Sequence, residues 1–348
     1  MNAELELIAT RLQEAQTPED VFGATTDTLR RNYHALARKV HPDLFSVDEE
    51  KLLAHAAFAQ LLEWFRQAEE KVLFGVYGHS MQVILQTRQR DYCIDDTPSE
   101  HGIFNIYPCR FTEDGKLHLA MLKLVREPRQ NGLAQNEIMA LRKLRSAPDA
   151  AKFSAYLPRL LDAFVYEDAG NQHQASVFER YSGWYSFEDV RRVYPNGIDP
   201  KDMTWMFRRV LTALGFAHRN GVIHGALTPR NVLILPEDHG LMLTGWHCAV
   251  SDPAFPVLDP GCGAWYLEDV LKGGPLSFGT DIVMAVKCMI FLSGGDVHLL
   301  PKPLQAFFKG SSLPGKRAPQ DAWALLKEFD ELIGRLWGRR TFRPFLMK

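Results

Sequence analysis

The chain has 348 residues, of which 46% are apolar and 24% are charged, and its 40 basic and 42 acidic side chains give a net charge of −2. This length is enough for one large domain or two unequal ones. The balanced charge argues against a nucleic-acid-binding protein, which would carry a strong basic excess.

Cysteine is sparse, and no two of the cysteines have the CxxC spacing of a zinc knuckle (Cys93, Cys109, Cys248, Cys262 and Cys288). This pattern predicts neither a disulfide framework nor a metal site, and it favours a reducing compartment. The acidic start lacks the basic residues and apolar core of a secretory signal. The longest apolar run, in 282–295, is interrupted by Lys287 and is too short to span a bilayer. We expect a soluble, cytoplasmic protein without a membrane partner.

The first 78 residues have the apolar spacing of helices, which is found over 5–15, 29–40 and 51–73. The stretch TPED at 17–20 has the order of a capping box, with proline at the first helical position. The second helix ends before Pro42, because proline cannot continue a helix. The sequence therefore predicts a helical N-terminal part.

From residue 82 the pattern changes to the two-residue alternation of strands, with strands expected in 82–94 and 99–125. EDGK at 113–116 predicts a hairpin turn. A helix follows at about 132–146, and after residue 200 the chain is mostly helical. A small β-rich part thus precedes a larger helical part.

Residues 17–78 resemble the J-domain of DnaK-class co-chaperones. The matching pieces are the leading PEDVFGA, the basic segment TLRRNYHALARKVHPD at 28–43 and the packing helix AFAQLLEWFRQAEEKVL at 57–73. The resemblance implies two antiparallel helices joined at the HPD tripeptide. It also implies that the basic face and HPD dock on a DnaK-class heat-shock chaperone and stimulate its ATPase.

The resemblance gives the chaperone-binding set, which consists of Arg30, Arg31, Arg38, Lys39, His41, Pro42 and Asp43. The cations would steer the helix to an acidic surface. Pro42 would fix the loop, and Asp43 would offer a carboxylate for a charge-assisted hydrogen bond. The alternative is that HPD merely ends a helix beside a solvated basic face. A J-domain that contacts only its own chain, in a regulatory scaffold, is a further alternative.

Residues 90–335 resemble a protein kinase domain, with its motifs in the order of that family. AMLKLV at 120–125 places Lys123 at the ATP-contacting lysine, and LAQNEIMALRKL at 133–144 places Glu137 at its glutamate partner. VFERYSGWYSFEDV at 177–190 resembles the last strand and the hinge, near Phe178 to Tyr181.

HGALTPRN at 224–231 resembles the catalytic loop, and LMLTGWHCAV at 241–250 resembles the DFG region. GAWYLEDVL at 263–271 resembles the APE segment, whose Glu268 the resemblance pairs with Arg317 as a buried structural ion pair. Asp281 is expected to accept backbone hydrogen bonds beneath the catalytic loop, and His224 is expected to be a buried structural histidine.

Phosphoryl transfer needs metal ions and a residue that orients the nucleophile. The resemblance puts Ala226 at the base aspartate and Thr228 at the loop lysine. It puts Gly245, or Thr244 in a register shifted by one, at the metal-binding aspartate. None of these side chains suits its position, because magnesium prefers carboxylate oxygen. Asn231 alone is retained among the metal and catalytic positions.

The glycine-rich loop SEHGIFNIY at 99–107 keeps Gly102, but His101 stands where another glycine is expected and would hinder close approach to phosphate. One electrostatic donor alone is typically worth about 3–4 kcal/mol of transition-state stabilisation. We therefore predict a pseudokinase, not an enzyme, with no catalytic residue, no metal and no cofactor. Lys123, Glu137 and Asn231 are its vestigial nucleotide-binding residues, and weak metal-independent ATP binding stays open.

The predicted fold class is α+β: an N-terminal helical J-domain hairpin followed by a bilobal protein-kinase-like fold. The predicted domains are a J-domain at 1–78, a β-rich lobe at 79–183 and a helical lobe at 184–348. The predicted function is a co-chaperone or adaptor that recruits a DnaK-class chaperone and holds an unknown client protein. The alternative is an unconventional ATP-dependent phosphoryl or nucleotidyl transferase that uses Lys123, Glu137 and Asn231, with Asp252 as a relocated metal ligand.

Overall fold

The computed structural model describes residues 2–73, 77–78, 82–95, 98–180, 182–251, 258–313, 317–339 and 341–347. The chain divides into two compact units, Met1–Pro98 with Tyr107–Met121, and Ser99–Ile106 with Leu122–Lys348. The domain limits expected at 78 and 183 stay predictions. In the described part of the chain, no helix has both the length and the apolar character needed to cross a membrane.

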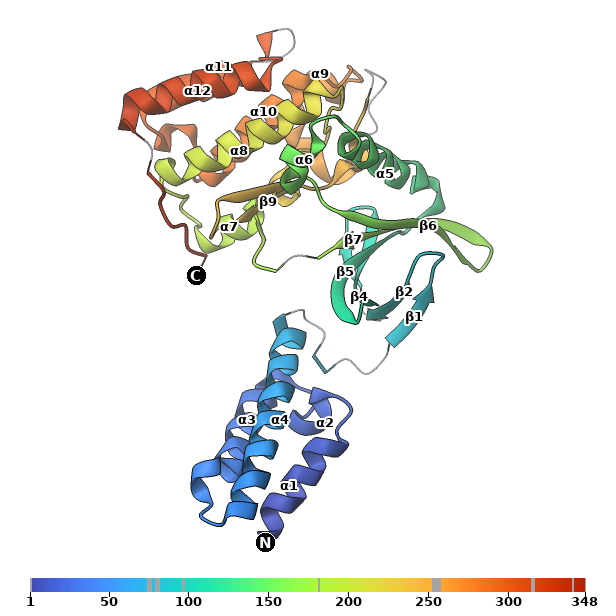
Figure 1. The fold of residues 1–348 in the computed structure, drawn as a ribbon. Coiled ribbons are helices and arrows are strands. Elements are labelled where there is room, and N and C mark those ends of the chain that lie inside the picture. Colours follow the sequence, from blue (N-terminus) through green and yellow to red (C-terminus); the bar gives the residue numbers. More distant parts are fainter. Residues whose placement is uncertain are drawn as a thin grey trace. The chain divides into compact units, whose positions relative to one another are not determined.

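The N-terminal helices are α1 (Ala3–Glu14), α2 (Pro18–Phe22), α3 (Thr26–Val40) and α4 (Asp48–Leu73), with the 3-10 turn η1 (Pro42–Leu44) between the last two. Figure 1 shows α1, α3 and α4 lying side by side, and both α1 and α3 contact α4. The expected helices are therefore confirmed, although α4 begins at Asp48 rather than at Lys51. We call these four helices the N-terminal bundle.

The apolar faces of these helices meet in an aromatic core. The rings of Tyr33 and Phe65 stack with centroids 3.9 Å apart, and Phe22 meets both rings edge-on. Such ring pairs stabilise a core beyond the area that they bury. At the start of α2, Thr17 N donates to Asp20 Oδ2 over 2.8 Å, which confirms the predicted capping box.

Seven strands form one sheet in the order β1-β2-β4-β5-β7-β6, with β3 paired to β4. Their bounds are β1 (Gln82–Gln86), β2 (Asp91–Asp95), β3 (Ser99–His101), β4 (Phe104–Glu113), β5 (Lys116–Val125), β6 (Leu160–Asp168) and β7 (Asn171–Glu179). Between β4 and β5, Asp114 and Gly115 have φ values of 52° and 73°. Two positive φ angles are what a tight hairpin turn requires, so the EDGK turn is confirmed. After a 3-10 turn, η2 (Pro128–Gln130), helix α5 (Asn131–Arg145) contacts β7.

The rest of the chain is mainly helical, as expected. Its longer helices are α7 (Phe187–Val193), α8 (Pro200–Arg219), α10 (Phe278–Leu292), α11 (Lys302–Ser311) and α12 (Ala322–Trp337). Its short elements are α6 (Ala150–Phe153), α9 (Glu268–Leu271), the strands β8 (Tyr185–Ser186), β9 (Val232–Leu235) and β10 (Gly240–Leu243), and the 3-10 turns η3 (Ser154–Tyr156), η4 (Pro229–Asn231), η5 (Trp246–Cys248), η6 (Pro260–Trp265) and η7 (Val297–Leu299).

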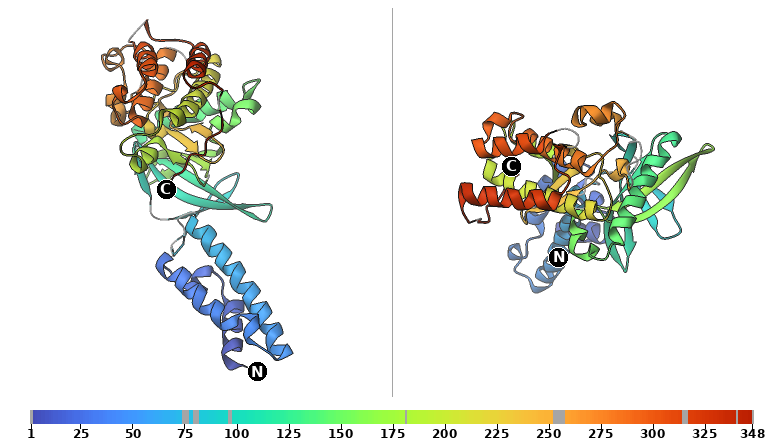
Figure 2. Two further views of the ribbon diagram at one scale, coloured as in Figure 1. Left: turned by 90° about the vertical axis from the view of Figure 1, so that its left-hand side faces the viewer. Right: turned by 90° about the horizontal axis from the view of Figure 1, so that it is seen from above.

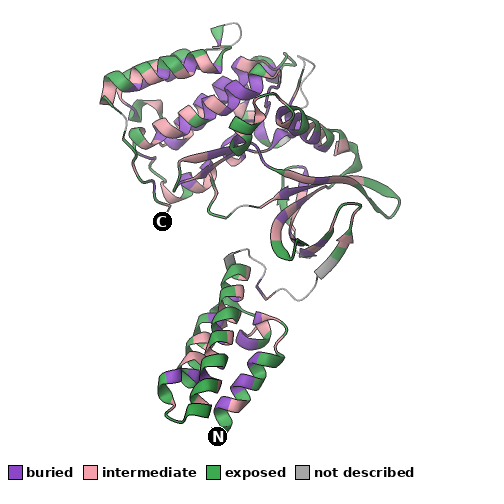
Figure 3. Cartoon of the chain, in the orientation of Figure 1, coloured by how far each residue is buried: buried purple, intermediate pink, exposed green. Residues whose placement is uncertain are grey.

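The core of this part is built around α8, which contacts both α10 and α12 (Figure 2). Figure 3 shows α8 and α10 with extensive buried surface. Helix α10 is apolar on nearly all sides, which is the pattern of a helix enclosed by its neighbours. Its one lysine, Lys287, lies where Nζ can donate to the carbonyl oxygens of Trp265 and Tyr266. Helix α10 supports the loop at 224–231, because its Asp281 accepts hydrogen bonds from the backbone of that loop.

Candidate functional site

The centre of the candidate site is an ion pair between strand β5 and helix α5. Lys123 Nζ donates to Glu137 Oε2 over 2.5 Å, and Glu137 is only 2% exposed. Glu137 Oε1 also accepts from Trp246 N over 3.2 Å, so the carboxylate joins α5 to the DFG-like segment. The Lys123 ammonium lies 4.1 Å from the ring centre of Phe104, which adds a cation–π contact. The structure thus brings together the lysine and glutamate that the motifs placed in these roles.

The catalytic-loop segment at 224–231 is held from below by Asp281 of α10. Asp281 is fully buried and accepts from His224 N over 2.7 Å and from Gly225 N over 2.9 Å. The third partner of its carboxylate is His218 Nε2, at 2.9 Å. The expectation that Asp281 supports this loop through backbone hydrogen bonds is confirmed.

His224 is buried completely, and its Nε2 lies 2.9 Å from Thr244 O. Burial lowers the pKa of His224 to about 4 despite the nearby carboxylate of Asp281. The imidazole is therefore neutral at pH 7. This environment fits the predicted structural role of His224.

Asn231 and Gly245 occupy the positions that bind metal in the kinase resemblance. Asn231 Nδ2 donates to Ala226 O over 2.7 Å, which holds the loop closed. Gly245 has a φ of 74°, and a Cβ atom there would lie 2.5 Å from Asn231 Oδ1. Thr244, the other register, donates its backbone N to Asn231 O over 2.9 Å. Neither position offers a carboxylate, and the side-chain amide of Asn231 fills the space that a side chain at Gly245 would need.

These residues do not fit a magnesium ion. Magnesium takes near-octahedral oxygen coordination that includes carboxylates. Within the residues that the structure describes, no group of three histidine, cysteine, aspartate or glutamate side chains could hold a metal. Asp252, the expected relocated ligand, lies outside the described residues. Thr228, at the loop-lysine position, is 2% exposed, and its hydroxyl has no hydrogen-bond partner.

Sequence reasoning missed a second buried ion pair close to the first. His247, the third residue of the DFG-like stretch, lies with Nε2 3.2 Å from Asp259 Oδ2. Both side chains are more than nine-tenths buried. Asp259 Oδ1 also accepts from Gly261 N over 2.8 Å, at the start of η6. The signal in the sequence was a histidine where the motif has glycine, but its partner lies 12 residues further on.

The expected buried pair of Glu268 and Arg317 is wrong. Glu268 lies at the exposed start of α9, with its side chain 82% exposed, and it pairs with Lys272 at 2.5 Å. Arg317 is exposed as well. A surface pair of this kind contributes little to stability. The hinge residue Tyr181 lies outside the described residues.

In the N-terminal bundle, the HPD tripeptide forms the turn between α3 and α4. His41 and Asp43 are exposed while Pro42 is buried, and Asp43 N donates to His41 Nδ1 over 3.3 Å. Arg30, Arg31 and Arg38 are exposed on α3.

Lys39, which was placed in the same docking set, forms an exposed ion pair with Glu4 of α1 at 2.8 Å. The α3 surface therefore presents three arginines, with the fourth cation shared with α1.

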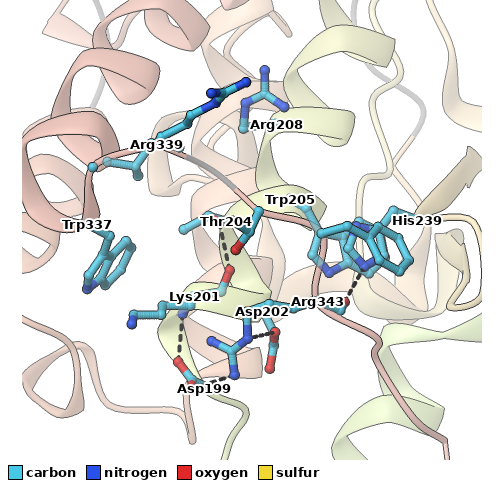
Figure 4. Close-up of a pocket in the computed structure, with 14 residues that line it drawn as sticks. Asp199, Lys201, Asp202, Thr204, Trp205, Arg208, His239, Trp337, Arg339 and Arg343 are labelled. Carbon is cyan, nitrogen blue, oxygen red and sulfur yellow. Dashed lines mark hydrogen bonds and ion pairs between the residues drawn. The ribbon is translucent and has the colours of Figure 1, made fainter.

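A cavity of about 520 Å³ lies elsewhere, between the first turns of α8, the end of α12 and the C-terminal segment (Figure 4). Arg343 reaches Asp199 and Asp202 at 3.1 and 3.3 Å, and the ring of His239 stacks between Trp205 and Phe342. None of the predicted site residues lines this cavity. Its charged groups tie the C-terminal segment to α8.

No family model matches this chain. A calcium/calmodulin-dependent protein kinase type 1 of Caenorhabditis elegans is 30% identical over 152 residues, which cover 42% of this chain and 39% of that protein. Casein kinase II subunit alpha' of Saccharomyces cerevisiae is 32% identical over 85 residues, 24% of each chain. The chain thus spans less than half the length of the curated relatives that it matches.

Solved structures share the fold. The BubR1 kinase domain aligns with a TM-score of 0.57 and 13% identity, over 74% of this chain and 84% of that one. Vaccinia related kinase 3 aligns with a TM-score of 0.57 and 15% identity, over 76% of this chain and 94% of that one.

The prediction that the chain is not an enzyme is wrong when it is set against these matches. The curated relatives that it matches over part of their length are named as protein kinases, so these matches do not support the prediction of an inactive relative. That prediction rested on the side chains that stand at Ala226, Thr228 and Gly245, and it took the retained Lys123–Glu137 pair as vestigial. The fold, the ordered motifs and these relatives together show that the chain contains a bilobal protein-kinase-like domain.

Proposed function

We propose that the kinase-like domain is an ATP-dependent transferase that moves a phosphoryl or nucleotidyl group to an acceptor. Lys123, Glu137 and Asn231 would hold the nucleotide. Transfer of the γ-phosphoryl group of ATP would release ADP, and transfer of the nucleotidyl group would release pyrophosphate. The observation that carries the proposal is the bond between Lys123 Nζ and Glu137 Oε2. The carboxylate orients the side chain of Lys123, and an amine group held in this way can donate to phosphate oxygens. The names of the kinase relatives support the same class of reaction.

The loop narrows the kind of acceptor. Ala226, at the position of the base, has no group that can take a proton, and it is fully buried. A hydroxyl acceptor would have to lose its proton without a general base at this position. A positioned general base typically raises the rate about 10²–10⁴-fold. A carboxylate or a neutral imidazole attacks through a free lone pair and needs no such base. We include an acceptor of this kind in the proposal.

The test uses the full chain with ATP labelled at the γ- or the α-phosphate, in magnesium, in manganese and in EDTA. Label from the γ-position that reaches protein or an added acceptor identifies phosphoryl transfer, and label from the α-position identifies nucleotidyl transfer. Lys123→Ala should abolish either signal. Lys116→Ala, at the exposed start of the same strand, is the matched control and should keep it. The absence of transfer under all conditions would overturn the proposal.

A second function is carried by a separate observation in the N-terminal bundle. The polar residues of the HPD turn face solvent beside three exposed arginines of α3. We propose that this bundle is a J-domain that recruits a DnaK-class chaperone and stimulates its ATPase, while the rest of the chain holds a client protein. Exposed cations raise association rates with an acidic partner, and an exposed carboxylate is available to a partner's arginine.

This second function is tested by the steady-state ATPase rate of a DnaK-class chaperone with the full chain added. The wild-type chain should raise the rate, and His41→Gln should remove the stimulation. His55→Gln, which changes an exposed histidine of α4, is the control and should stimulate like the wild type. Equal stimulation by the wild type and by His41→Gln would contradict the J-domain proposal.

A further inference from the structure

Cationic groups gather around the turn between β3 and β4. Gly102 in this turn has a φ of 59°, and the next residues lead into Phe104. Lys123 Nζ lies 4.1 Å from the ring centre of Phe104, and the ring of His247 meets the ring of Phe104 edge-on at 5.8 Å. Burial and the charges of Arg230, Lys123 and His247 lower the pKa of His101. Lys123, His247 and Arg230 therefore lie around the turn that remains from the glycine-rich loop.

His247 is the buried member of this group. It is 7% exposed, and its Nε2 is bound to Asp259. Burial lowers the pKa of His247, but the hydrogen bond that its Nε2 donates to Asp259, together with the neighbouring Cys248 side chain, outweighs burial and raises the pKa to about 9. The other ring nitrogen, Nδ1, is buried and has no hydrogen-bond partner. A protonated ring with an unpaired N–H requires an acceptor, and burial without one is costly.

Asp259 brings this imidazolium close to the glycine turn. A Cβ atom on Gly102 would lie 3.8 Å from Asp259 Oδ2, the oxygen that binds His247. Each cation near the turn has a carboxylate neighbour: Glu137 beside Lys123, Asp259 beside His247 and Glu188 beside Arg230. A phosphate group bound at the turn would therefore lie among three ion pairs.

The metal-binding carboxylate is thus absent at Gly245, and a buried cation stands two residues further along the same segment. We propose that the site binds the phosphates of its nucleotide directly, without a divalent metal, with the His247 Nδ1–H donating to a phosphate oxygen and Asp259 acting as a positioning residue. This inference rests on the proposed transferase function, because it names how that site would take its nucleotide. In this proposal the N–H group of His247 takes the place of a metal ion as the group that contacts a phosphate oxygen.

The test is equilibrium binding of ATP and of inorganic tripolyphosphate to the full chain, in EDTA and in excess magnesium. We expect both ligands to bind in EDTA and magnesium to give no gain in affinity. His247→Gln removes the charge and should weaken binding in EDTA about tenfold or more. His298→Gln, at an exposed histidine, is the matched control and should bind normally. Binding that requires magnesium, or that is unchanged in His247→Gln, would overturn the inference.

A measurement on the unchanged protein covers the case in which His247→Gln does not fold. Binding of tripolyphosphate in EDTA should fall as the pH rises through about 9, because His247 then loses its proton. The groups that face its ring are Asp259, Glu137, Cys248 and Phe104, and the pKa of Asp259 is lowered to about 2, so Asp259 does not titrate in this range. Affinity that stays constant across this range would contradict the proposed role of His247.

These outcomes separate the two proposals. If ATP binds in EDTA but no label is transferred, the transferase proposal is contradicted and the metal-free phosphate site is supported. If label is transferred but ATP binds only with magnesium, the transferase proposal is supported and the metal-free phosphate site is contradicted.

Discussion

The HPD turn and the catalytic-loop segment are both short polar motifs that follow a long helix, but the first is exposed and the second is buried. In the turn, His41 and Asp43 are exposed and make one local hydrogen bond with each other. In the loop, His224 and Asn231 are buried and bound to Asp281, Thr244 and Ala226. An exposed motif can act only through another molecule, whereas a buried one is retained by the fold that it supports. The motif residues of the HPD turn are therefore available for binding another molecule, whereas those of the catalytic-loop segment support the fold.

The largest effect is expected where the loop rests on α10. Asp281→Ala leaves the backbone N–H groups of His224 and Gly225 without their buried acceptor. Loss of one partner from a buried charged network costs about 3–5 kcal/mol of unfolding free energy. Urea unfolding measures this, with Glu328→Gln on the exposed side of α12 as the control. A loss below about 1 kcal/mol would show that the loop does not depend on its support.

The second effect is a pH dependence in the same region. The pKa of His247 is raised from 6.5 to about 9, so its contribution to stability is complete below pH 6.5 and is lost as the pH rises through about 9. For Asp259, whose hydrogen bond from His247 lowers the pKa to about 2, the loss occurs as the pH falls through about 2. The alkaline loss is on the order of 3 kcal/mol.

Melting temperatures between pH 6 and pH 9.5 check this dependence. The wild type should lose more stability on the alkaline side than His247→Gln, which has no proton to release. Parallel curves for the two proteins would show that the pair does not stabilise the fold.

A third, smaller effect tests how tightly the loop has closed over the lost metal position. Gly245→Ala places a Cβ atom 2.5 Å from the Asn231 amide and keeps a φ of 74° that favours glycine. The strain should cost about 1–3 kcal/mol. Gly263→Ala is the control, because nothing lies within 4 Å of its added Cβ atom. Thermal unfolding of both variants measures the difference, and equal melting temperatures would mean that the loop has room for a side chain.

The smallest effect is expected at the HPD turn. His41→Gln should change the unfolding free energy by less than about 0.5 kcal/mol, because the ring is exposed and its partner Asp43 is its own neighbour. Leu61→Ala, at a fully buried position of α4, should cost about 2–5 kcal/mol in the same bundle. A large loss in His41→Gln would make the turn a structural feature like the loop at 224–231.

Local rules were enough for the elements. Proline at 42, the capping box at 17–20, the EDGK turn and the helices α3, α4 and α5 follow from backbone chemistry and apolar spacing within a few residues. The motif order also located Lys123, Glu137 and Asn231, and the first two meet as expected. The role of Asp281 in supporting the catalytic loop was predictable for the same reason, because the neighbouring motifs fix its position in the motif order. These features depend on interactions between residues that are close together in the sequence.

Tertiary structure alone decided the rest. The pair of His247 and Asp259, the closure of Asn231 over Gly245, and the exposure that separates Glu268 from Arg317 all depend on which segments meet in space. Sequence spacing specifies the identity of a side chain but neither its burial nor its partner. Burial decides whether a histidine is neutral, as at His224, or a trapped cation, as at His247. The desolvation cost and the neighbouring charge that decide between these states exist only once the fold has formed.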